Sequence, residues 1–378
     1  MKILNIDEKK LTAKLLERRL SNIGYHVTTV KNGKEAVEQL KVRKPNLVIL
    51  DINMSNFGGI DVLKFIKESG LDTKVMVISG EKEQALVSDL FEYGIDEYIK
   101  KPATLTEILI RINKLVGMSS LPDEFYQQNE EVVRELSIGV VIPCYNEASR
   151  LLSKSFVHFV SRNVGYYLCF VNDGSTDNTL EVLEEMKQGR EDYIGVYNCA
   201  TNGGKAEAVR QGMLHLINDN DLALDYLGFL DADLSTDLND FDDLVKTINL
   251  NNYKIVSGSR ISRIGANISR ESARQVISMS INYIIRKILG MNFKDTQCGA
   301  KILDREAVKT VFNEKFLTRW LFDVEMFLRM KKRYGMRAKE MIYEQPLKRW
   351  VHAEGSKLSM RDSLKIGSQL MKIAAHYK

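Results

Sequence analysis

Two carboxylates, Asp231 and Asp233, lie two residues apart, directly after the apolar run Tyr226–Leu230. A short apolar run that ends in acids predicts a buried parallel strand whose carboxyl end reaches the edge of a sheet. Open α/β sheets bind ligands at that edge, and paired carboxylates there suit Mg²⁺ or Mn²⁺ together with substrate phosphates. Asp-x-Asp is also common in polar loops, so its meaning depends on the motifs around it.

Three further polar motifs follow the same rule. Pro143–Glu147 comes after the predicted strand Ile138–Ile142, and Asn172–Asp177 comes after the predicted strand Tyr166–Val171. Asn202-Gly-Gly-Lys205 opens a predicted helix. Because the carboxyl ends of parallel strands meet at one edge, we expect these motifs to lie beside the paired carboxylates.

The residue types in these motifs suit a nucleoside diphosphate. Asp173, followed by Gly174 in a tight turn, provides an acceptor for a base or ribose. Lys205 places a cation and exposed amides at the start of a helix, where a diphosphate binds readily. Taken singly, each has an ordinary alternative, a generic turn for Asn-Asp-Gly-Ser and a solvated helix residue for Lys205.

The first 118 residues alternate short apolar segments with amphipathic ones. The predicted strands are Lys2–Ile6, His26–Val30, Asn46–Leu50, Lys74–Ile78 and Glu97–Ile99. The predicted helices are Leu11–Ile23, Gly33–Leu40, Ile60–Glu68, Glu83–Tyr93 and Leu105–Leu115. Repeated strand–helix units predict an α/β fold with a doubly wound, five-stranded parallel sheet.

Polar residues also end the strands of this first domain. Asp7, Glu8 and Asp51 suit a Mg²⁺ site, and that metal and the Lys101 ammonium would neutralise a phosphoryl group on Asp51. Ser79, at the end of the fourth predicted strand, is placed to donate a hydrogen bond to the same group.

Composition limits the remaining choices. The chain has 378 residues, which is enough for two domains, and its net charge of +4 gives no indication of nucleic-acid binding. Residues 331–378 are locally basic, with 12 Lys/Arg against 4 Asp/Glu, and suit an anionic surface. Four cysteines without Cys-x-x-Cys spacing indicate free thiols rather than zinc. No apolar run is long enough to predict a membrane span.

Between the two predicted domains, residues 119–136 are polar and acid-rich, which is typical of a linker. We expect a helix over Asp123–Glu135, as either a transmitter or a spacer. The expected organisation is a first domain over residues 1–118, this linker, and a second domain over residues 137–378.

The first domain resembles the receiver domain of two-component response regulators along its whole length, with the CheY-like fold. The resemblance implies a phosphorelay role: Asp51 as phospho-acceptor, Ser79 and Lys101 as its responders, Tyr98 as switch aromatic, and a sensor histidine kinase or phosphotransfer protein as partner. Ser55 stands where such receivers usually have proline. A homodimer through the receiver is expected, and the alternative is a degenerate receiver kept only as a dimerisation block.

The second domain resembles family 2 inverting glycosyltransferases with the GT-A fold, a Rossmann-like arrangement around a mostly parallel sheet. Downstream motifs are similar to the polyprenyl-phosphate hexose synthase branch, which includes the dolichyl-phosphate glucosyltransferases and mannose synthases. They are Ser257-Gly-Ser-Arg260, Arg274, Asp295-Thr-Gln-Cys-Gly299, Lys301, Arg319-Trp320, Phe322-Asp-Val-Glu325 and Glu354-Gly-Ser-Lys-Leu358. Ala206 and Ala300 depart from the usual glycine and aromatic residue, and the second departure bears on the acceptor.

This resemblance implies a hexosyltransferase with a nucleoside-diphosphate sugar, of the UDP-glucose or GDP-mannose type, as donor and a polyprenyl-phosphate-like lipid as acceptor. The nucleotide sugar would be bound by Pro143, Tyr145, Glu147, Asp173, Lys205 and Asp231. Asp231 and Asp233 would hold Mg²⁺ or Mn²⁺. Arg260, Arg274 and Lys357 would bind the acceptor phosphate, and Asp295 and Gln297 would orient the reacting groups or help hold the metal.

Two alternatives stay open. A soluble or cell-surface glycan acceptor would need a carboxylate base, with Asp295 or Asp323 as candidates. A catalytically inactive transferase fold could instead serve as a signalling output module, which the intact acids argue against.

Two apolar stripes at helical spacing occur in the second domain, at Ile277, Ile281, Ile284 and Ile288, and at Leu364, Met371 and Ala374. Each stripe faces either the core or, given a lipid acceptor, a membrane surface. We expect the chain to be cytoplasmic. The alternative to a purely cytosolic location is peripheral contact with the inner face of the membrane.

Overall fold

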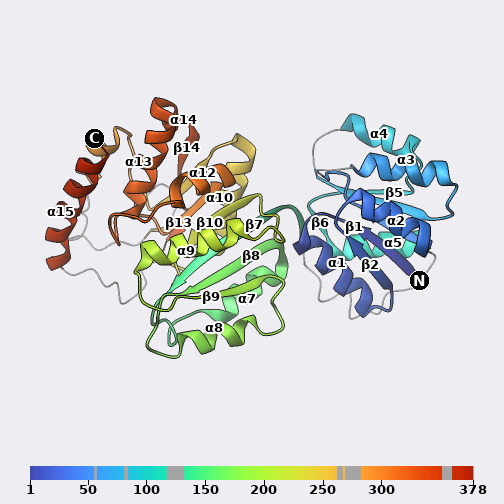
Figure 1. The fold of residues 1–378 in the computed structure, drawn as a ribbon, viewed down its shortest axis with the longest axis horizontal. Coiled ribbons are helices and arrows are strands. Elements are labelled where there is room, and N and C mark those ends of the chain that lie inside the picture. Colours follow the sequence, from blue (N-terminus) through green and yellow to red (C-terminus); the bar gives the residue numbers. More distant parts are fainter. Residues whose placement is uncertain are drawn as a thin grey trace. The chain divides into compact units, whose positions relative to one another are not determined.

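The computed structural model describes residues 1–54, 58–80, 84–116, 132–261, 267–268, 282–350 and 360–377. It contains two compact units (Figure 1). The first contains Met1–Ser137 with Val157–Tyr167 and Asn220–Ala223, and the second contains Ile138–Phe156, Leu168–Asp219 and Leu224–Lys378.

The first unit contains a five-stranded sheet in the order β2-β1-β3-β4-β5, and every neighbouring pair is parallel. Its strands are β1 (Lys2–Ile6), β2 (His26–Val30), β3 (Leu47–Leu50), β4 (Lys74–Ser79) and β5 (Glu97–Lys100). The helices are α1 (Lys10–Asn22), α2 (Gly33–Arg43), α3 (Gly59–Ser69), α4 (Gln84–Glu92) and α5 (Leu105–Val116). The predicted doubly wound sheet is confirmed.

Two apolar clusters, one on each face, hold this sheet together. Leu16 of α1 and Ile108 of α5 pack with strand residues in one cluster, and Leu40 of α2 and Val62 of α3 pack with strand residues in the other. Helices on both faces bury both sides of the central strand β3, which is why all four of its residues, Leu47–Leu50, are apolar and buried. The strand ends are therefore the places where polar groups can gather.

The second sheet, most of whose residues belong to the second unit, has the order β14-β11-β13-β10-β7-β8-β9. Its strands are β7 (Val132–Cys144), β8 (Asn163–Asn172), β9 (Ile194–Asn198), β10 (Tyr226–Leu230), β11 (Ile255–Ser259), β13 (Ala300–Asp304) and β14 (Ile342–Pro346). Strand β13 runs antiparallel to both β10 and β11, whereas β10–β7, β8–β9 and β11–β14 are parallel. The sheet is mostly parallel, as predicted.

The helices of the second unit cover both faces of this sheet. They are α7 (Ser153–Arg162), α8 (Thr179–Lys187), α9 (Lys205–Asn218), α10 (Leu238–Asn251), α12 (Arg305–Phe312), α13 (Phe322–Tyr334), α14 (Ala338–Met341) and α15 (Met360–His376), with the 3₁₀ turn η1 (Gly335–Arg337). The short strands β12 (Asn267–Ile268) and β15 (Arg349–Trp350) pair with each other.

Strand β10 shows how these layers are separated. A Cβ atom at Gly228 would lie 2.7 Å from the ring of Phe241 in α10, whereas the neighbouring Phe229 packs against Phe322 in α13 with ring centroids 5.6 Å apart. Because successive strand residues point to opposite faces, α10 and α13 cover opposite sides of the sheet.

The predicted linker helix is wrong where the structure describes it. Residues 132–135 belong to β7, and Val132 and Val133 pair antiparallel with Thr104 and Ala103 of the short strand β6 (Ala103–Thr104). Backbone pairing with a neighbouring strand satisfies the amide groups of this polar segment, so it needs no helix.

The predicted apolar stripes also differ from the observed buried faces. Residues 282–289 are helical, and their buried residues are Ile285 and Leu289, while Ile284 is 46% exposed and Ile288 is half-buried. Over residues 366–376 of α15 the buried residues are Leu370 and Ile373, while Met371 is 69% exposed. Ile277 and Ile281 lie outside the described residues. In each helix a second line of apolar residues runs beside the predicted stripe, and the residues of this second line are the buried ones.

No helix among the described segments has both the length and the apolar character needed to cross a membrane.

Candidate active site

The polar motifs of the second unit meet at the carboxyl edge of its sheet. Strand β10 ends directly before Asp231, and β7 ends at Cys144, whose carbonyl accepts a 2.9 Å hydrogen bond from the amide of Asp173 at the end of β8. This bond ties the Pro143–Glu147 motif to the Asn172–Asp177 motif. The predicted convergence of strand ends is therefore observed.

Helix α9 delivers Lys205 to this edge. A Cβ atom at Gly212 would lie 2.6 Å from Val141 in β7 and 2.8 Å from Val171 in β8, so α9 rests closely on the sheet. Gly204 caps the helix with a φ of +83°, a conformation that favours glycine. Lys205 Nζ then lies 2.5 Å from Asp231 Oδ1.

Asp173 holds the Asn202–Lys205 loop. Its Oδ1 accepts from the amide of Gly203 at 2.8 Å, and its Oδ2 accepts from the amide of Gly204 at 2.9 Å. Burial raises the pKa of the Asp173 carboxyl, although these two amides oppose the shift. Asp173, which is predicted to contact the nucleoside, therefore also fixes the loop that leads into Lys205, the predicted diphosphate contact.

The Pro143–Glu147 motif forms a rigid turn beside these residues. Asn146 has a φ of +52°, the Glu147 amide donates to Thr179 Oγ1 at 2.8 Å, and the Glu147 carboxylate pairs with Arg150. Tyr145 is 36% exposed, and Pro143 is half-buried.

The two acids after β10 occupy different surroundings. A Cβ atom at Gly299 would lie 1.9 Å from Asp231 Oδ2, so only glycine fits there, and the Asp295–Gly299 segment backs this carboxylate. Asp233 Oδ1 accepts from the Ser235 amide at 2.9 Å.

The described residues contain no group of three or more acids, histidines or cysteines able to hold a metal ion. Two carboxylates from one short segment, Asp231 and Asp233, nevertheless suit Mg²⁺ or Mn²⁺, because substrate phosphates complete such sites.

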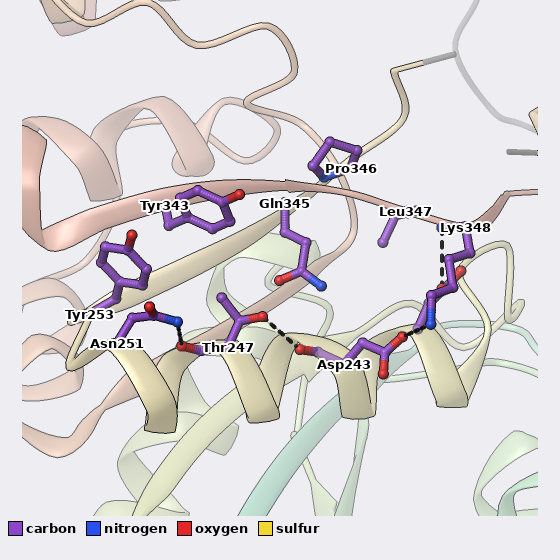
Figure 2. Close-up of a pocket in the computed structure, with 10 residues that line it drawn as sticks. Asp243, Thr247, Asn251, Tyr253, Tyr343, Gln345, Pro346, Leu347 and Lys348 are labelled. Carbon is purple, nitrogen blue, oxygen red and sulfur yellow. Dashed lines mark hydrogen bonds and ion pairs between the residues drawn. The ribbon is translucent and has the colours of Figure 1, made fainter. Parts of the chain in front are cut away.

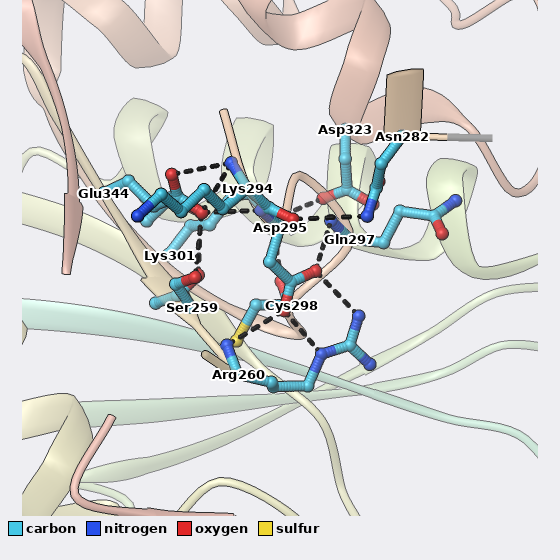
Figure 3. Close-up of polar contacts among 12 residues, drawn as sticks. Ser259, Arg260, Asn282, Lys294, Asp295, Gln297, Cys298, Lys301, Asp323 and Glu344 are labelled. Carbon is cyan, nitrogen blue, oxygen red and sulfur yellow. Dashed lines mark hydrogen bonds and ion pairs between the residues drawn. The ribbon is translucent and has the colours of Figure 1, made fainter. Parts of the chain in front are cut away.

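Arg260 and Asp295 form a forked ion pair (Figure 3). Arg260 Nε lies 2.6 Å from Asp295 Oδ2, Nη2 lies 2.8 Å from Oδ1, and the Arg260 amide donates to Oδ2 at 2.9 Å. Burial acts to raise the pKa of Asp295, but the Arg260 guanidinium outweighs it and lowers the pKa below its ordinary value. The guanidinium also lies 5.5 Å from the ring of Trp350.

Glu344 of β14 holds this segment from behind. Its carboxylate accepts from the amide of Asp295 at 2.6 Å, from the amide of Lys294 at 2.9 Å, and from Ser259 Oγ at 2.8 Å (Figure 3). Gln297 is half-buried, and its backbone N–H donates to Asp295 Oδ1 at 3.3 Å. Both oxygens of Asp295 thus contact protein groups.

A buried ion pair lies under the site. Lys301 Nζ is 2.7 Å from Asp323 Oδ1 and 2.7 Å from the carbonyl oxygen of Cys298, and the Lys301 side chain is 0% exposed (Figure 3). Burial has the largest effect and raises the pKa of Asp323 above its ordinary value, although the charges of Lys301 and Lys205 act to lower it. Sequence reasoning noted both residues of the pair but not their contact, which only the packing of α13 against β13 creates.

Arg319 is a second residue whose position was not predicted. A Cβ atom at Gly204 would lie 3.2 Å from Arg319 Cδ, and the Arg319 charge acts on the Asp173 carboxylate. The residue is exposed, beside Trp320, which is 49% exposed. The Arg-Trp pair in the sequence was the only signal. The predicted acceptor cations Arg274 and Lys357 lie outside the described residues.

In the first unit, three of the residues predicted to form a phosphorylation site contact one another. Asp7, Asp51, Ser79 and Lys101 are all buried, and Lys101 Nζ lies 2.7 Å from Asp51 Oδ2 and 3.8 Å from Asp7 Oδ2. Glu8 and Tyr98 are half-buried. The loop residue Ser55 lies outside the described residues.

Asp7 is also engaged by its own helix, since Thr12 Oγ1 donates to Asp7 Oδ2 at 2.6 Å and the Lys9 amide donates to Oδ1 at 2.8 Å. Burial raises the pKa of Asp7, and the negative charge of Asp51 acts in the same direction. A divalent cation between the two acids would offset that repulsion, so the donor set suits Mg²⁺.

A cavity of about 360 Å³ runs along α10 and β14 (Figure 2). Tyr253 and Tyr343 stack at one end, with ring centroids 5.1 Å apart. Near the other end, the Asp240 carboxylate accepts from the amides of Lys348 and Arg349 at 3.2 and 2.9 Å. Its lining contains none of the predicted site residues.

Comparisons with known proteins agree with this geometry. Residues 3–113 match the family model for the response regulator receiver domain, and residues 139–312 match the model for glycosyl transferase family 2. A dolichyl-phosphate β-glucosyltransferase of Trichomonas vaginalis is 30% identical over 258 residues, which are 65% of this chain and 75% of that protein.

Two further relatives cover different parts of the chain. A dolichyl-phosphate β-glucosyltransferase of Saccharomyces cerevisiae is 29% identical over 279 residues, covering 68% of this chain and 79% of that protein. The cell cycle transcriptional regulator CtrA of Caulobacter vibrioides is 33% identical over 119 residues, covering 32% of this chain and 52% of that protein.

Proposed function

This chain belongs to the family 2 glycosyltransferases and carries a response regulator receiver domain, and from that premise we propose that it transfers a hexose from a nucleoside-diphosphate sugar to a polyprenyl-phosphate-type lipid. The observation that carries this proposal is the contact between Lys205 and Asp231 at the sheet edge, where Asp173 fixes the intervening loop. The names of the relatives point to the lipid phosphate.

The donor site would use residues of three strand ends and of the start of α9. Tyr145, Glu147 and Asp173 would surround the nucleoside, and Lys205 would contact the diphosphate. A divalent cation held by Asp231 and Asp233 would stabilise the negative charge that develops on the leaving diphosphate.

The acceptor chemistry requires cations rather than a strong base. A phosphate monoester is largely dianionic near neutral pH, because its second pKa is about 6, so it can attack the anomeric carbon without losing a proton. Arg260 would help to position that anion, in line with its fixed orientation: its forked pairing with Asp295 holds the guanidinium at the site. Arg274 and Lys357 are the further candidates.

The first unit would regulate the transfer. Phosphorylation of Asp51 by a histidine kinase or phosphotransfer protein would place a phosphoryl group beside Lys101, with Mg²⁺ bound by Asp7, Glu8 and Asp51. The buried contact between Lys101 and Asp51 supports this role.

The test is an assay of purified full-length protein with UDP-glucose or GDP-mannose, Mg²⁺ or Mn²⁺, and either polyprenyl phosphate or soluble oligosaccharides. We expect a glycolipid from the lipid acceptor, and a loss of at least about 100-fold in rate for Asp233→Asn, as for removal of a group that stabilises the leaving charge. If product forms only with soluble oligosaccharides, the acceptor is a soluble glycan and the proposal of a lipid acceptor is wrong. Full activity of Asp233→Asn would overturn the metal assignment.

A further inference from the structure

The ammonium of Lys205 is paired with the Asp231 carboxylate, which a divalent cation would need as a ligand. Its Nζ lies 2.5 Å from Asp231 Oδ1, while the backbone of Gly299 backs the other oxygen of Asp231. The side chains of Lys205 and Asp231 are 29% and 33% exposed, so the pair lies at the surface of the site rather than beneath it. An incoming cation would meet an ammonium already placed on this carboxylate.

Lys205 also has other anions nearby. The carboxylates of Asp323 and Asp233 attract its ammonium in addition to that of Asp231. Asp323 is itself held in place by the fully buried Lys301 at 2.7 Å. The ammonium can therefore leave Asp231 without losing all of its negative surroundings, which makes an exchange of partners accessible.

We propose that Lys205 competes with the divalent cation for Asp231 and yields it when a diphosphate arrives, so that the site binds the cation weakly alone and tightly together with a nucleoside diphosphate. This inference rests on the proposed donor site. The physical reason is charge: a cation added without a diphosphate is placed next to the ammonium, whereas a diphosphate offers the ammonium a new anionic partner. Coupling of this kind is reciprocal between the two ligands.

The competition predicts opposite effects of one substitution. Lys205→Met removes the competing ammonium, so the cation alone should bind more tightly. The same change removes a diphosphate contact, so the nucleotide should bind less tightly and should improve cation binding less than in the wild type. Lys205→Arg keeps the positive charge and should keep the weak binding of the cation alone.

The test is titration of full-length protein with Mn²⁺, followed by the electron paramagnetic resonance signal of the free ion, with and without UDP or GDP. All variants carry Asp51→Asn to weaken binding at the receiver site, and Asp231→Asn/Asp233→Asn gives the background to subtract. Lys246→Met is the matched control, because Lys246 pairs with Asp242 and Asp243 on α10.

We expect Lys205→Met to bind Mn²⁺ alone about fivefold or more tightly than the control, and to lose most of the gain from nucleotide, within the usual range of such coupling. Unchanged affinity for Mn²⁺ alone in Lys205→Met, with binding still dependent on Asp231 and Asp233, would overturn the competition only. If Asp231→Asn/Asp233→Asn binds as many Mn²⁺ ions, and as tightly, as the Asp51→Asn parent, the metal site of the proposed function would instead be overturned. Thermal melting of each variant checks that it is folded, and if Lys205→Met is not, Lys205→Gln takes its place.

Discussion

Asp231 is contacted from two sides, by the ammonium of Lys205 and by the backbone of Gly299. The first contact joins residues 26 positions apart and the second joins residues 68 positions apart in the chain. A single carboxylate is thus positioned by a helix start and by a distant loop, and small changes in either should alter its chemistry.

Gly299→Ala tests the second contact. The added Cβ atom would lie 1.9 Å from Asp231 Oδ2, so the carboxylate or the loop must move. We expect a fall in transfer rate of about 100-fold, because displacements of about 1 Å have that effect at active sites. Gly367→Ala is the control, since a Cβ atom there meets nothing within 4 Å. Equal rates for the two variants, measured as glycolipid formed per minute, would contradict this account.

The pair of Arg260 and Asp295 predicts a pH dependence of stability. Burial alone would raise the pKa of Asp295, but Arg260 lowers it below the ordinary value of 3.8. A group with a depressed pKa in the folded state adds stability above its ordinary pKa and loses it as the pH falls through the folded pKa. This contribution is therefore complete at neutral pH and disappears only below about pH 4.

Asp295→Asn should lower the free energy of unfolding at pH 7 by about 3 kcal/mol, because it leaves a largely buried guanidinium without its carboxylate. The difference from the wild type should shrink as the pH falls below about 4. Urea unfolding of both proteins from pH 3 to pH 7 measures it, and a difference that is constant over that range would rule out the ionic contribution.

At the scale of elements, the start of α13 serves two purposes. Asp323 faces the sheet and pairs with Lys301, while Glu325, 0% exposed, accepts from Arg329 Nη2 at 2.7 Å and from the Leu317 amide at 2.8 Å. Tyr377, directly after α15, donates to Glu325 Oε1 at 2.9 Å. The Phe-Asp-Val-Glu motif therefore combines a site contact with an anchor for the last helix.

Tyr377→Phe should separate these two purposes. It removes two hydrogen bonds, the one donated to the buried Glu325 carboxylate and the one accepted from Arg329 Nε at 3.1 Å. It should cost about 1.5 to 3 kcal/mol of unfolding free energy, with the transfer rate unchanged. Tyr343→Phe, at a side chain that is 40% exposed, should change stability by no more than about 0.5 kcal/mol. Urea unfolding followed by tryptophan fluorescence distinguishes them, and a loss of transfer rate in stable Tyr377→Phe would link the anchor to the reaction.

At the scale of the whole molecule, each of the two units has a site at the carboxyl edge of its own sheet. In both, a lysine is paired with an aspartate that the proposed chemistry uses, Lys101 with Asp51 and Lys205 with Asp231. A phosphoryl group on Asp51 would carry about 1.5 to 2 negative charges in place of the single charge of the carboxylate, and would change the balance of that buried cluster.

If phosphorylation of Asp51 regulates the enzyme, a small phosphodonor such as acetyl phosphate should change the transfer rate of the wild type. The change should be about twofold or more if the coupling free energy is near 0.5 kcal/mol. The rate of Asp51→Asn should not change. Initial rates with and without the phosphodonor measure this. Asp61→Asn, at a residue in the first turn of α3, serves as the matched control. An equal response of the wild type and Asp51→Asn would exclude phosphorylation of this residue as the cause.

Much of the site could be read from the sequence, because its motifs are local. Apolar runs followed by acids, amides or glycines place Asp51, Asp173 and Asp231 at strand ends, and these ends meet wherever strands run parallel. The linker helix was predicted wrongly because backbone pairing replaces it at residues 132–135. For the stripes of Ile284 and Met371 the sequence left two orientations open, and these two side chains are exposed.

The two fold families, the strand ends and the residue types gathered there follow from local patterns, since the periods of strands and helices are local properties of the chain. Which cation pairs with each carboxylate depends instead on how distant segments pack. Arg260 pairs with Asp295, Lys301 with Asp323 and Lys205 with Asp231, over separations of 35, 22 and 26 residues. These partners come together only when helices and loops pack on the sheet. Removing one member of the most buried pair, Lys301 and Asp323, would leave a buried charge without its partner.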